Sequence, residues 1–278
     1  MNTQISEDEF RLFRDLIHRE CGLYFSDNKR SFLSSRIGKR LTAKSMGSFY
    51  GYYRYLQETG REQEEELLRL LDILTINETS FFRNRPQFEF LEEVALPELA
   101  EEKKKQGDFL FRIWSAGCST GEEPYSIAIS AIESLTPRSA WEIRVYASDL
   151  SLTALERADH GIYPVEKLQG LSPQREGRYF SETEEGYRIR DEVKRVVIYD
   201  FHNLKHENGL RDLDVVFCRN VLIYFDPAEQ KRVVAKLVRA LRPGGYLFLG
   251  HSESVQGQFD DLKFVHHGRG TAYRKVAP

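Results

Sequence analysis

The sequence has few cysteines, no long apolar run and no excess of basic residues. Its three cysteines, Cys21, Cys118 and Cys218, form no CxxC pair, which is typical of a reducing cytosol and not of a disulfide framework. No apolar stretch approaches the roughly 18–20 residues of a membrane span, and the acidic start MNTQISEDEF is unlike a signal peptide. The formal net charge of -3 argues against a general nucleic-acid binder, which is usually basic.

The chain does contain enough residues, 278 with an ordinary globular composition, for one large and one small domain. Residues 1–75 show apolar residues at helical spacing only, which predicts a small helical N-terminal domain. Its four helices are expected at about 6–21, 28–45, 50–58 and 62–74. Residues 76–107 predict a linker and a connecting helix that is restarted by Pro97 and ended by Gly107.

Residues 108–278 alternate between strand-like and helix-like segments, which predicts a mostly parallel α/β sheet with helices on both faces. Residues 172–193 interrupt this alternation and predict a small antiparallel β-subdomain. The motif Leu241–Tyr246 is expected to form the turn between the last helix and its strand. The strands are expected at 109–114, 142–147, 195–199, 213–218 and 246–250, the helices at 122–135, 152–160 and 227–241, and a hairpin at 264–274.

The loop Ala116–Glu123 connects the first expected strand to its helix. Gly117 and Gly121 permit a tight turn and a close approach of a ligand to the backbone, and the N–H groups that begin the helix favour a carboxylate or a phosphate. The spacing G-x-x-x-G is neither the dinucleotide-binding fingerprint nor a P-loop. Taken alone, the loop is also compatible with a purely structural turn.

Polar residues follow the later strands, at the edge where parallel sheets bind ligands. Asp149 could accept hydrogen bonds from the ribose hydroxyls of an adenosine group, or cap the following helix. Asn203 could contact the edge of an adenine base, or cap a turn. Arg219 and Asn220 come directly after the apolar strand 213–218, which indicates a pocket at this position.

Four longer motifs occur in the order TINETSFFRN, SAGCSTGEEPYSIA, CRNVLIYFD and LRPGGYLFLGHSES. Together they closely resemble the chemotaxis receptor methyltransferases of the CheR type, over essentially the whole chain. The resemblance implies an all-α N-terminal domain and a Rossmann-like methyltransferase domain with a β-subdomain. It also implies S-adenosylmethionine as methyl donor, S-adenosylhomocysteine as product, no metal, and glutamate γ-carboxylates of bacterial chemoreceptors as acceptors.

The resemblance also implies roles for individual residues. Glu123, or its neighbour Glu122, would bind the methionine end of the cofactor, Asp149 the ribose, and Asn203 with Leu204 would lie beside the adenine. The full set of implied cofactor-binding residues is Asn77, Thr79, Arg83, Gly117, Glu123, Asp149, Asn203, Leu204, Arg219 and Asn220.

Two residues are expected to act on the acceptor. A glutamate side chain has a pKa of about 4.3 and is already a nucleophile at neutral pH, so methyl transfer needs no general base. We therefore expect Arg83 to orient the acceptor, with a brace between the domains as the alternative, and Tyr224 to add a hydrogen bond. The chain shows no Ser/His/Asp or Cys/His constellation, in keeping with this chemistry.

The second helix is expected to dock the receptor. Arg36, Arg40 and Lys44 recur at four-residue spacing and share one helix face, with Lys39 beside them. This basic face suits the acidic helical bundle of a chemoreceptor and would steer association, unless it is simply a solvated surface. The short turn 181–186 lacks the glycine-rich extension of relatives that grip a receptor tail, which argues against such a tether.

The expected protein is thus a cytoplasmic monomer that is recruited to receptor arrays, without nucleic-acid partners or membrane insertion. The alternatives are a methyltransferase for another protein, RNA or a small molecule, and a non-catalytic adaptor that binds the cofactor. The acidic balance and TINETSFFR argue against the first alternative, and the intact set of polar pocket residues argues against the second.

Overall fold

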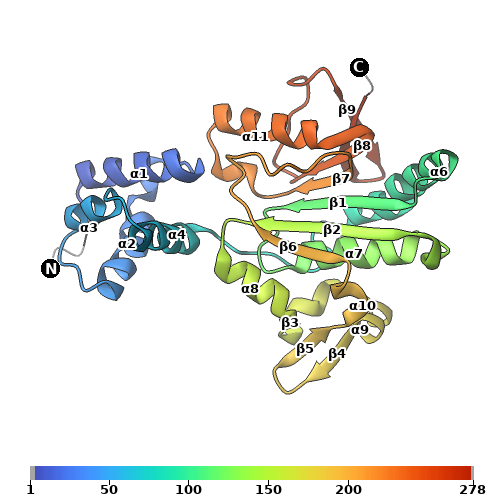
Figure 1. The fold of residues 1–278 in the computed structure, drawn as a ribbon, viewed down its shortest axis with the longest axis horizontal. Coiled ribbons are helices and arrows are strands. Elements are labelled where there is room, and N and C mark those ends of the chain that lie inside the picture. Colours follow the sequence, from blue (N-terminus) through green and yellow to red (C-terminus); the bar gives the residue numbers. More distant parts are fainter. Residues whose placement is uncertain (1–3, 277–278) are drawn as a thin grey trace.

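The computed structural model describes residues 4–276. They form a helical N-terminal domain, a seven-stranded sheet with helices on both faces, and a separate three-stranded sheet (Figure 1). The N-terminal helices lie beside one end of the large sheet, and α6 lies at the opposite end. In the described residues, no helix combines the length and the apolar character that crossing a bilayer requires.

The N-terminal domain consists of α1 (Glu7–Cys21), α2 (Arg30–Ala43), α3 (Phe49–Leu56) and α4 (Arg61–Leu74). Helix α1 begins with a capping box between Ser6 and Glu9 and ends at Gly22, which adopts a left-handed conformation. The four helices pack around a core of their own, which includes Phe10 and Phe13. The predicted helical domain is therefore confirmed.

The connecting segment is one nearly continuous helix with a change of type in its middle. Helix α5 (Arg85–Phe90) passes into a π-helical turn at Leu91–Ala95, and α6 (Leu96–Gln106) follows with Pro97 in its first turn. Proline has no N–H to donate, and it follows directly on the π-helical turn, where the Leu96 N–H donates to the Leu91 carbonyl and the α-helical hydrogen-bond pattern is already interrupted. Gly107 ends α6 with φ 69°, as its sequence position predicts.

The large sheet has the strand order β6-β2-β1-β7-β8-β10-β9. The first five strands in this order are mutually parallel, and β10 pairs antiparallel with both β8 and β9. Chain order reverses between β1 and β7, and such a switch point is where open α/β sheets bind ligands. The strands are β1 (Leu110–Ala116), β2 (Glu142–Asp149), β6 (Val197–Phe201), β7 (Leu213–Cys218), β8 (Leu241–Leu249), β9 (Leu262–His267) and β10 (Gly270–Lys275).

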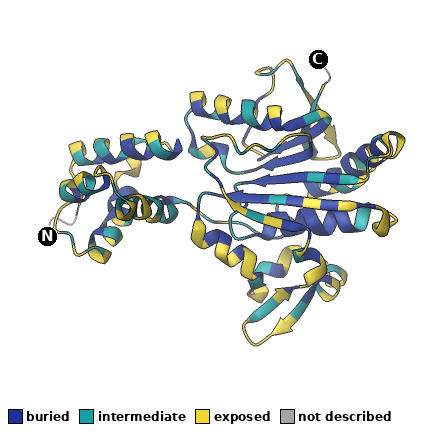
Figure 2. Ribbon diagram, in the orientation of Figure 1, coloured by how far each residue is buried: buried dark blue, intermediate teal, exposed yellow. Residues whose placement is uncertain are grey.

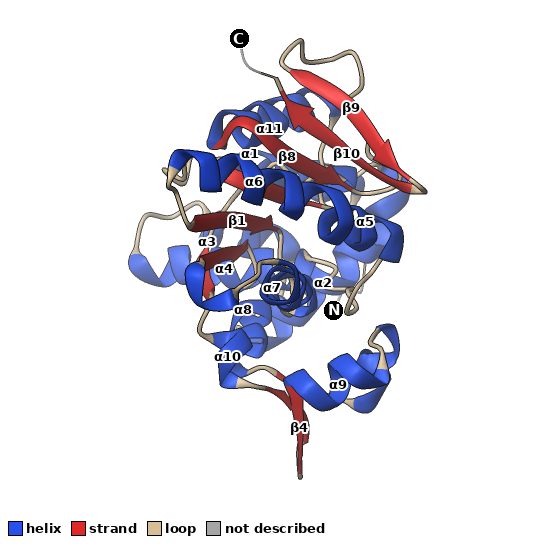
Figure 3. Cartoon of the chain, turned by 90° about the vertical axis from the view of Figure 1, so that its right-hand side faces the viewer, coloured by secondary structure: helices blue, strands red, loops and turns tan. Residues whose placement is uncertain are grey.

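The central strands of the sheet are largely buried (Figure 2), and their alternate residues belong to two separate hydrophobic cores. On β7, Phe217 belongs to the core beneath α5, α6 and α7 (Glu122–Ser134), and Val216 belongs to the core beneath α11 (Pro227–Ala240). Figure 3 shows the sheet between these helices. Helix α8 (Leu152–His160) follows β2 and lies near the β6 edge.

Two expectations for this domain are corrected. The β-subdomain extends beyond 172–193, because β3 (Ile162–Tyr163) pairs with β5 (Gly186–Ile189), and β5 pairs with β4 (Phe180–Thr183). A two-residue strand is too short to show a periodicity. The Leu241–Tyr246 motif belongs to β8 and is no free turn, since a register shift between β7 and β8 accommodates its extra residues. Helices α9 (Pro173–Tyr179) and α10 (Asp191–Lys194) flank this subdomain.

Candidate active site

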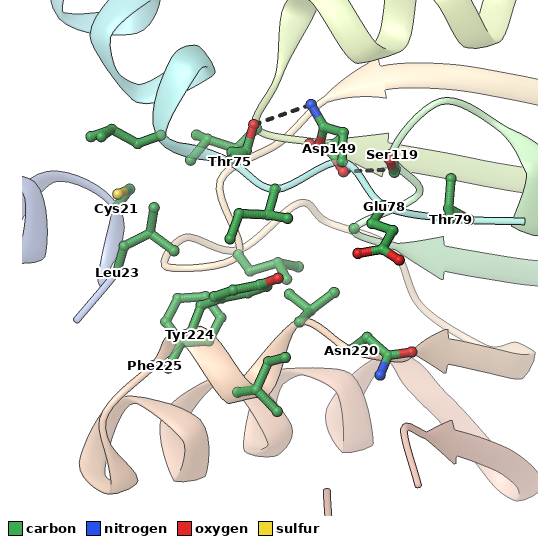
Figure 4. Close-up of a pocket in the computed structure, with 18 of the residues that line it drawn as sticks. Cys21, Leu23, Thr75, Glu78, Thr79, Ser119, Asp149, Asn220, Tyr224 and Phe225 are labelled. Atoms are coloured by element: carbon green, nitrogen blue, oxygen red, sulfur yellow. Dashed lines mark hydrogen bonds between the residues drawn. The ribbon is translucent and has the colours of Figure 1, made fainter. Parts of the chain in front are cut away.

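A cavity of about 370 Å³ opens at the carboxyl ends of the parallel strands, within the roughly 300–1,000 Å³ of small-molecule sites. Three regions line it: the N-terminal domain, the linker that follows α4, and the loops after β1, β2, β6 and β7 (Figure 4). The cavity brings together Asn77, Thr79, Arg83, Gly117, Glu123, Asp149, Asn203, Leu204, Arg219, Asn220 and Tyr224.

The glycine loop wraps over the end of β2. Gly117 has φ 81° and Ser119 has φ 52°, which turns the chain sharply after β1. The N–H groups of Gly117 and Cys118 both donate to the Ser148 carbonyl, at 2.8 and 3.0 Å, and the Ser119 N–H donates to Asp149 Oδ2 at 2.8 Å. The loop is therefore attached to the strand end that carries Asp149, as Figure 4 shows.

Asp149 is buried, and burial raises the pKa of its carboxyl, against the opposing effect of hydrogen bonds from the N–H groups of Ser151 and Ser119. It does not cap the next helix. That position belongs to Ser151, whose hydroxyl accepts a hydrogen bond from the Ala154 N–H. The carboxylate thus faces the cavity with each oxygen already accepting one hydrogen bond, and each retains a further acceptor position.

The two neighbouring glutamates of the loop have different environments. Glu123 lines the cavity and is held by Ser115 Oγ at 2.8 Å and by Arg219 Nε at 2.8 Å. Glu122 is fully buried, accepts a hydrogen bond from Thr120 Oγ1 and forms an ion pair with Lys167 at 3.0 Å, away from the cavity lining. Of the two candidates, Glu123 is the one positioned to reach a ligand.

Arg219 connects the glycine loop to the linker. Besides its ion pair with Glu123, its Nη1 donates to the Arg83 carbonyl at 2.6 Å and to Gln87 Oε1 at 3.0 Å. Gln87 in turn donates to the carbonyl of Leu249 at 2.7 Å. Arg219 is therefore a structural link that fixes the backbone of Arg83, and its guanidinium has little freedom to contact an acceptor.

Arg83 and Tyr224 line the same cavity from the linker and from the loop after β7. The Arg83 side chain is partly exposed, and among residues 4–276 its one hydrogen bond goes to the Glu78 carbonyl, at 2.8 Å. Burial raises the pKa of Tyr224, and the nearby Arg83 opposes this shift. The phenol therefore keeps its proton at neutral pH and can donate a hydrogen bond. In Figure 4, Glu78 extends into the cavity from the wall that faces Asn220 and Tyr224.

The N-terminal domain contributes a wall of the cavity. Leu23 forms an isolated β-bridge with Phe225, and the Tyr24 N–H donates to the Tyr224 carbonyl at 2.8 Å. Asn203 Nδ2 donates to the Glu20 carbonyl at 2.8 Å, and Asn203 Oδ1 accepts from the Lys205 N–H. Asn203 therefore caps its turn and joins the domains, and its amide is already engaged where it borders the cavity.

The basic face predicted on α2 is divided by ion pairs. Arg40 forms a two-pronged contact with the buried Glu66, at 2.8 and 2.7 Å, and Lys44 pairs with Glu62 at 2.8 Å. Arg40 is thus engaged by a buried carboxylate within the domain, which corrects its assignment to a free docking face, whereas the Lys44–Glu62 pair lies at the surface and the docking role of Lys44 stays a prediction. Within residues 4–276, Arg36 and Lys39 form no ion pair, and they remain available to a partner.

The cavity suits S-adenosylmethionine by the chemistry of its donors and acceptors. Two of its residues carry a buried polar atom without a hydrogen-bond partner, Ser119 Oγ and His202 Nε2. The carboxylates of Asp149 and Glu123 match a ribose diol and an ammonium group, and apolar side chains such as Leu204 could contact a base. In the described part of the chain, no cluster of three or more His, Cys, Asp or Glu is arranged to hold a metal ion.

Two family models cover nearly the whole sequence. The model described as CheR methyltransferase, all-alpha domain, matches residues 8–75, and the one described as CheR methyltransferase, SAM binding domain, matches residues 77–270. The chain belongs to the CheR methyltransferase family. It is accordingly an enzyme with S-adenosylmethionine as its methyl donor, and the Rossmann-like fold expected from its motifs is confirmed.

Curated relatives of this CheR chain match along most of their own length. Chemotaxis protein methyltransferase 2 of Vibrio cholerae is 37% identical and covers 98% of this chain and 94% of its own. The chemotaxis protein methyltransferase of Salmonella typhimurium is 37% identical, over 90% of this chain and 85% of its own. That of Borreliella burgdorferi is 32% identical, over 95% of this chain and 94% of its own.

Several cavity residues of this CheR chain escape sequence reasoning. Leu23, Tyr24 and Phe225 line the cavity only because the N-terminal domain docks on the loop after β7. His202 lies beside Asn203 and carries no distinguishing spacing. The roles of individual residues in catalysis and cofactor binding remain predictions, and their convergence on one cavity is the structural support for them.

Proposed function

We propose that this methyltransferase esterifies glutamate side chains on the cytoplasmic helical bundles of bacterial chemoreceptors, as part of sensory adaptation. The observation that carries the proposal is the position of Arg83 and Tyr224 in the same cavity as the candidate cofactor residues. Its support includes relatives named chemotaxis protein methyltransferase at 32–37% identity over most of the chain. Methylation of RNA or a small molecule is less favoured, because none of these relatives is named for it.

Methyl transfer to a carboxylate requires the protein to place and partly desolvate the acceptor, and it requires no general base. S-adenosylmethionine supplies, when bound, a methyl group on a positively charged sulfur. The acceptor carboxylate is ionised at neutral pH, so the enzyme must place it in line and remove part of its water. Good placement alone can contribute roughly 7–11 kcal/mol to a barrier reduction. Arg83 orients the acceptor through the oxygen that does not attack, because a cation on the attacking oxygen would weaken the nucleophile.

Labelled methyl transfer tests the function directly. The enzyme is incubated with methyl-labelled S-adenosylmethionine and membranes that contain chemoreceptors, and the label is then treated with base. Release of the label as methanol from receptor protein identifies carboxyl methyl esters. Base-stable label, label in RNA or a small molecule, or cofactor binding without transfer would each contradict the proposal.

Charge reversal at both Arg36 and Lys39 to Glu is expected to lower kcat/KM for receptor substrate about tenfold at low salt, because steering of an acidic partner is lost. The effect should shrink as salt screens the exposed charges. Steady-state methylation at several ionic strengths measures it, with S-adenosylhomocysteine affinity expected to stay unchanged. The control replaces Lys104 and Lys105 on α6 by Glu, which changes the net charge by the same amount at the other end of the sheet.

Arg40 provides a contrast within the same helix. Its reversal to Glu would place a second carboxylate beside the buried Glu66, which should destabilise the N-terminal domain. Thermal unfolding distinguishes this structural role of Arg40 from a docking role of Arg36 and Lys39. Arg40→Glu should lower the unfolding midpoint, and the Arg36/Lys39 double variant should not. Equal kcat/KM for the Arg36/Lys39 variant and the parent enzyme would exclude the docking role.

A further inference from the structure

Glu253 is a buried carboxylate outside the cavity lining that the mechanism so far does not use. It follows β8, 8% of its surface is exposed, and no cation pairs with it among residues 4–276. Its oxygens accept three backbone hydrogen bonds instead. Oε2 accepts from the N–H groups of Gly250 at 2.6 Å and Asn220 at 2.9 Å, and Oε1 accepts from the Ile223 N–H at 3.2 Å.

Two of these donors belong to the loop that carries the acceptor side of the cavity. Asn220 adopts φ 58°, a left-handed conformation that is uncommon for a non-glycine residue and that contacts from its surroundings stabilise. The hydrogen bonds to Asn220 and Ile223 bracket this conformation on both sides. Tyr224 follows directly, so the position of its side chain depends on the same backbone.

The carboxylate is the group that this arrangement requires. Three N–H donors converge on two oxygens, and an ionised carboxylate offers only acceptors. A glutamine would direct its NH₂ group at one or more of these backbone donors. Gly250 is part of the same fit, because a Cβ at this position would lie 2.5 Å from Glu253 Oε2 and 2.9 Å from the Asn220 nitrogen.

Three carbonyls of the loop accept hydrogen bonds from residues outside it. Gln230 Nε2 donates to the carbonyls of Leu222 and Phe225, at 2.9 and 3.0 Å, and Tyr24 donates to the Tyr224 carbonyl. These three carbonyls are thus held by Gln230 on α11 and by the N-terminal domain, whereas the N–H groups of Asn220 and Ile223 donate to Glu253. Loss of Glu253 would leave those two donors without an acceptor.

We propose that Glu253 is a positioning residue for methyl transfer, which fixes the backbone of residues 220–223 and through it the side chains of Asn220 and Tyr224 beside the acceptor. The inference rests on the proposed function for the identity of the acceptor. Asp149, Glu123 and the glycine loop are held by other contacts, so Glu253 affects placement of the acceptor far more than cofactor affinity.

The test compares Glu253→Gln with the parent enzyme in two assays. Turnover at saturating S-adenosylmethionine and receptor is expected to fall at least about tenfold, and the Kd for S-adenosylhomocysteine, from calorimetry, to stay within about threefold, since misplacement of reacting groups acts on the rate. Asp108→Asn is the control for a carboxylate that accepts a backbone N–H, from Leu110, at the far end of β1. It should leave turnover unchanged.

Gly250→Ala is the second variant, because the added Cβ would lie too close to Glu253 Oε2 and would displace the carboxylate. It should show the same selective loss of turnover, and the double variant should be no slower than the slower single variant. Unchanged turnover in Glu253→Gln, additive losses, or equal losses of turnover and cofactor affinity would overturn the inference. A parent enzyme that forms no base-labile esters would instead refute the proposed function.

Discussion

Replacing Arg83 by alanine is expected to lower turnover by about 100-fold or more, because a misplacement of about 1 Å in the reacting groups already costs this much. The expectation follows from its surroundings. Arg83 borders the cavity, lies near enough to Tyr224 to influence the pKa of that phenol, and uses its guanidinium for one hydrogen bond, to the Glu78 carbonyl. Most of its donors therefore remain available to a carboxylate.

Stability should change little in this variant, since the side chain is partly exposed and Arg219 holds the Arg83 backbone through its carbonyl. Single-turnover methylation and thermal unfolding are the two measurements. Arg85→Ala is the matched control: this arginine is two residues away, 78% exposed, and pairs with Glu89 on the surface of α5. Its loss should affect neither quantity.

Arg83→Lys adds a finer distinction. Lysine keeps the charge but is a flexible point charge, and it lacks the rigid planar set of N–H donors that fixes the orientation of a carboxylate. We expect the lysine variant to recover only a small part of the lost turnover. Comparable losses of turnover and stability in Arg83→Ala would mean that Arg83 braces the two domains, and the orienting role would have to be abandoned.

The parts of the molecule that sequence reasoning predicts well are those determined by neighbours along the chain. A nearly continuous apolar run identifies β7, since Leu213–Cys218 is a fully buried strand, and the capping box at Ser6 marks the start of α1. Several candidate cofactor residues are recognisable because they end or closely follow a strand, as Gly117, Asp149 and Arg219 do, whereas those of the linker have no such signal. Parallel strands bring those ends together at one edge of the sheet, whatever the length of the connections.

The errors arise where a residue's role depends on a distant partner. Arg40 has helical spacing with Arg36, but Glu66, 26 residues later, decides that it is a structural cation. Glu253 lies in a recognisable motif, yet its function depends on N–H groups of residues 220 and 223. Periodicity and local composition carry no information on such pairings, because these are set by the packing of whole elements.

A second large effect is expected from a buried ion cluster at the opposite end of the sheet from the cavity. Asp214 on β7 has no exposed surface, and Lys103 on α6 is 2% exposed. The Asp214 carboxylate contacts Lys103 Nζ at 3.1 Å and Arg242 Nε at 2.8 Å, and it accepts the Arg112 N–H of β1 at 2.8 Å. The cluster thus joins α6 to three strands.

Asp214→Asn should lower the free energy of unfolding by about 3 kcal/mol, the lower end of the cost of breaking a buried pair, because Asp108 and Glu102 still face the two cations. This corresponds to a fall of roughly 6–12 °C in the thermal midpoint. Lys104→Met, which breaks an exposed pair with Glu101 one position along α6, is the control and should cost less than about 1 kcal/mol.

The double variant Lys103→Met with Asp214→Asn decides the cause of the loss. If an uncompensated buried charge destabilises Asp214→Asn, removal of the second charge should restore part of the stability, and the double variant should unfold at a higher temperature than Asp214→Asn alone. Turnover well below the midpoint should stay unchanged in both, because the cluster does not border the cavity. A double variant that is less stable than Asp214→Asn would show that Lys103 contributes through its packing and its contact with Asp108.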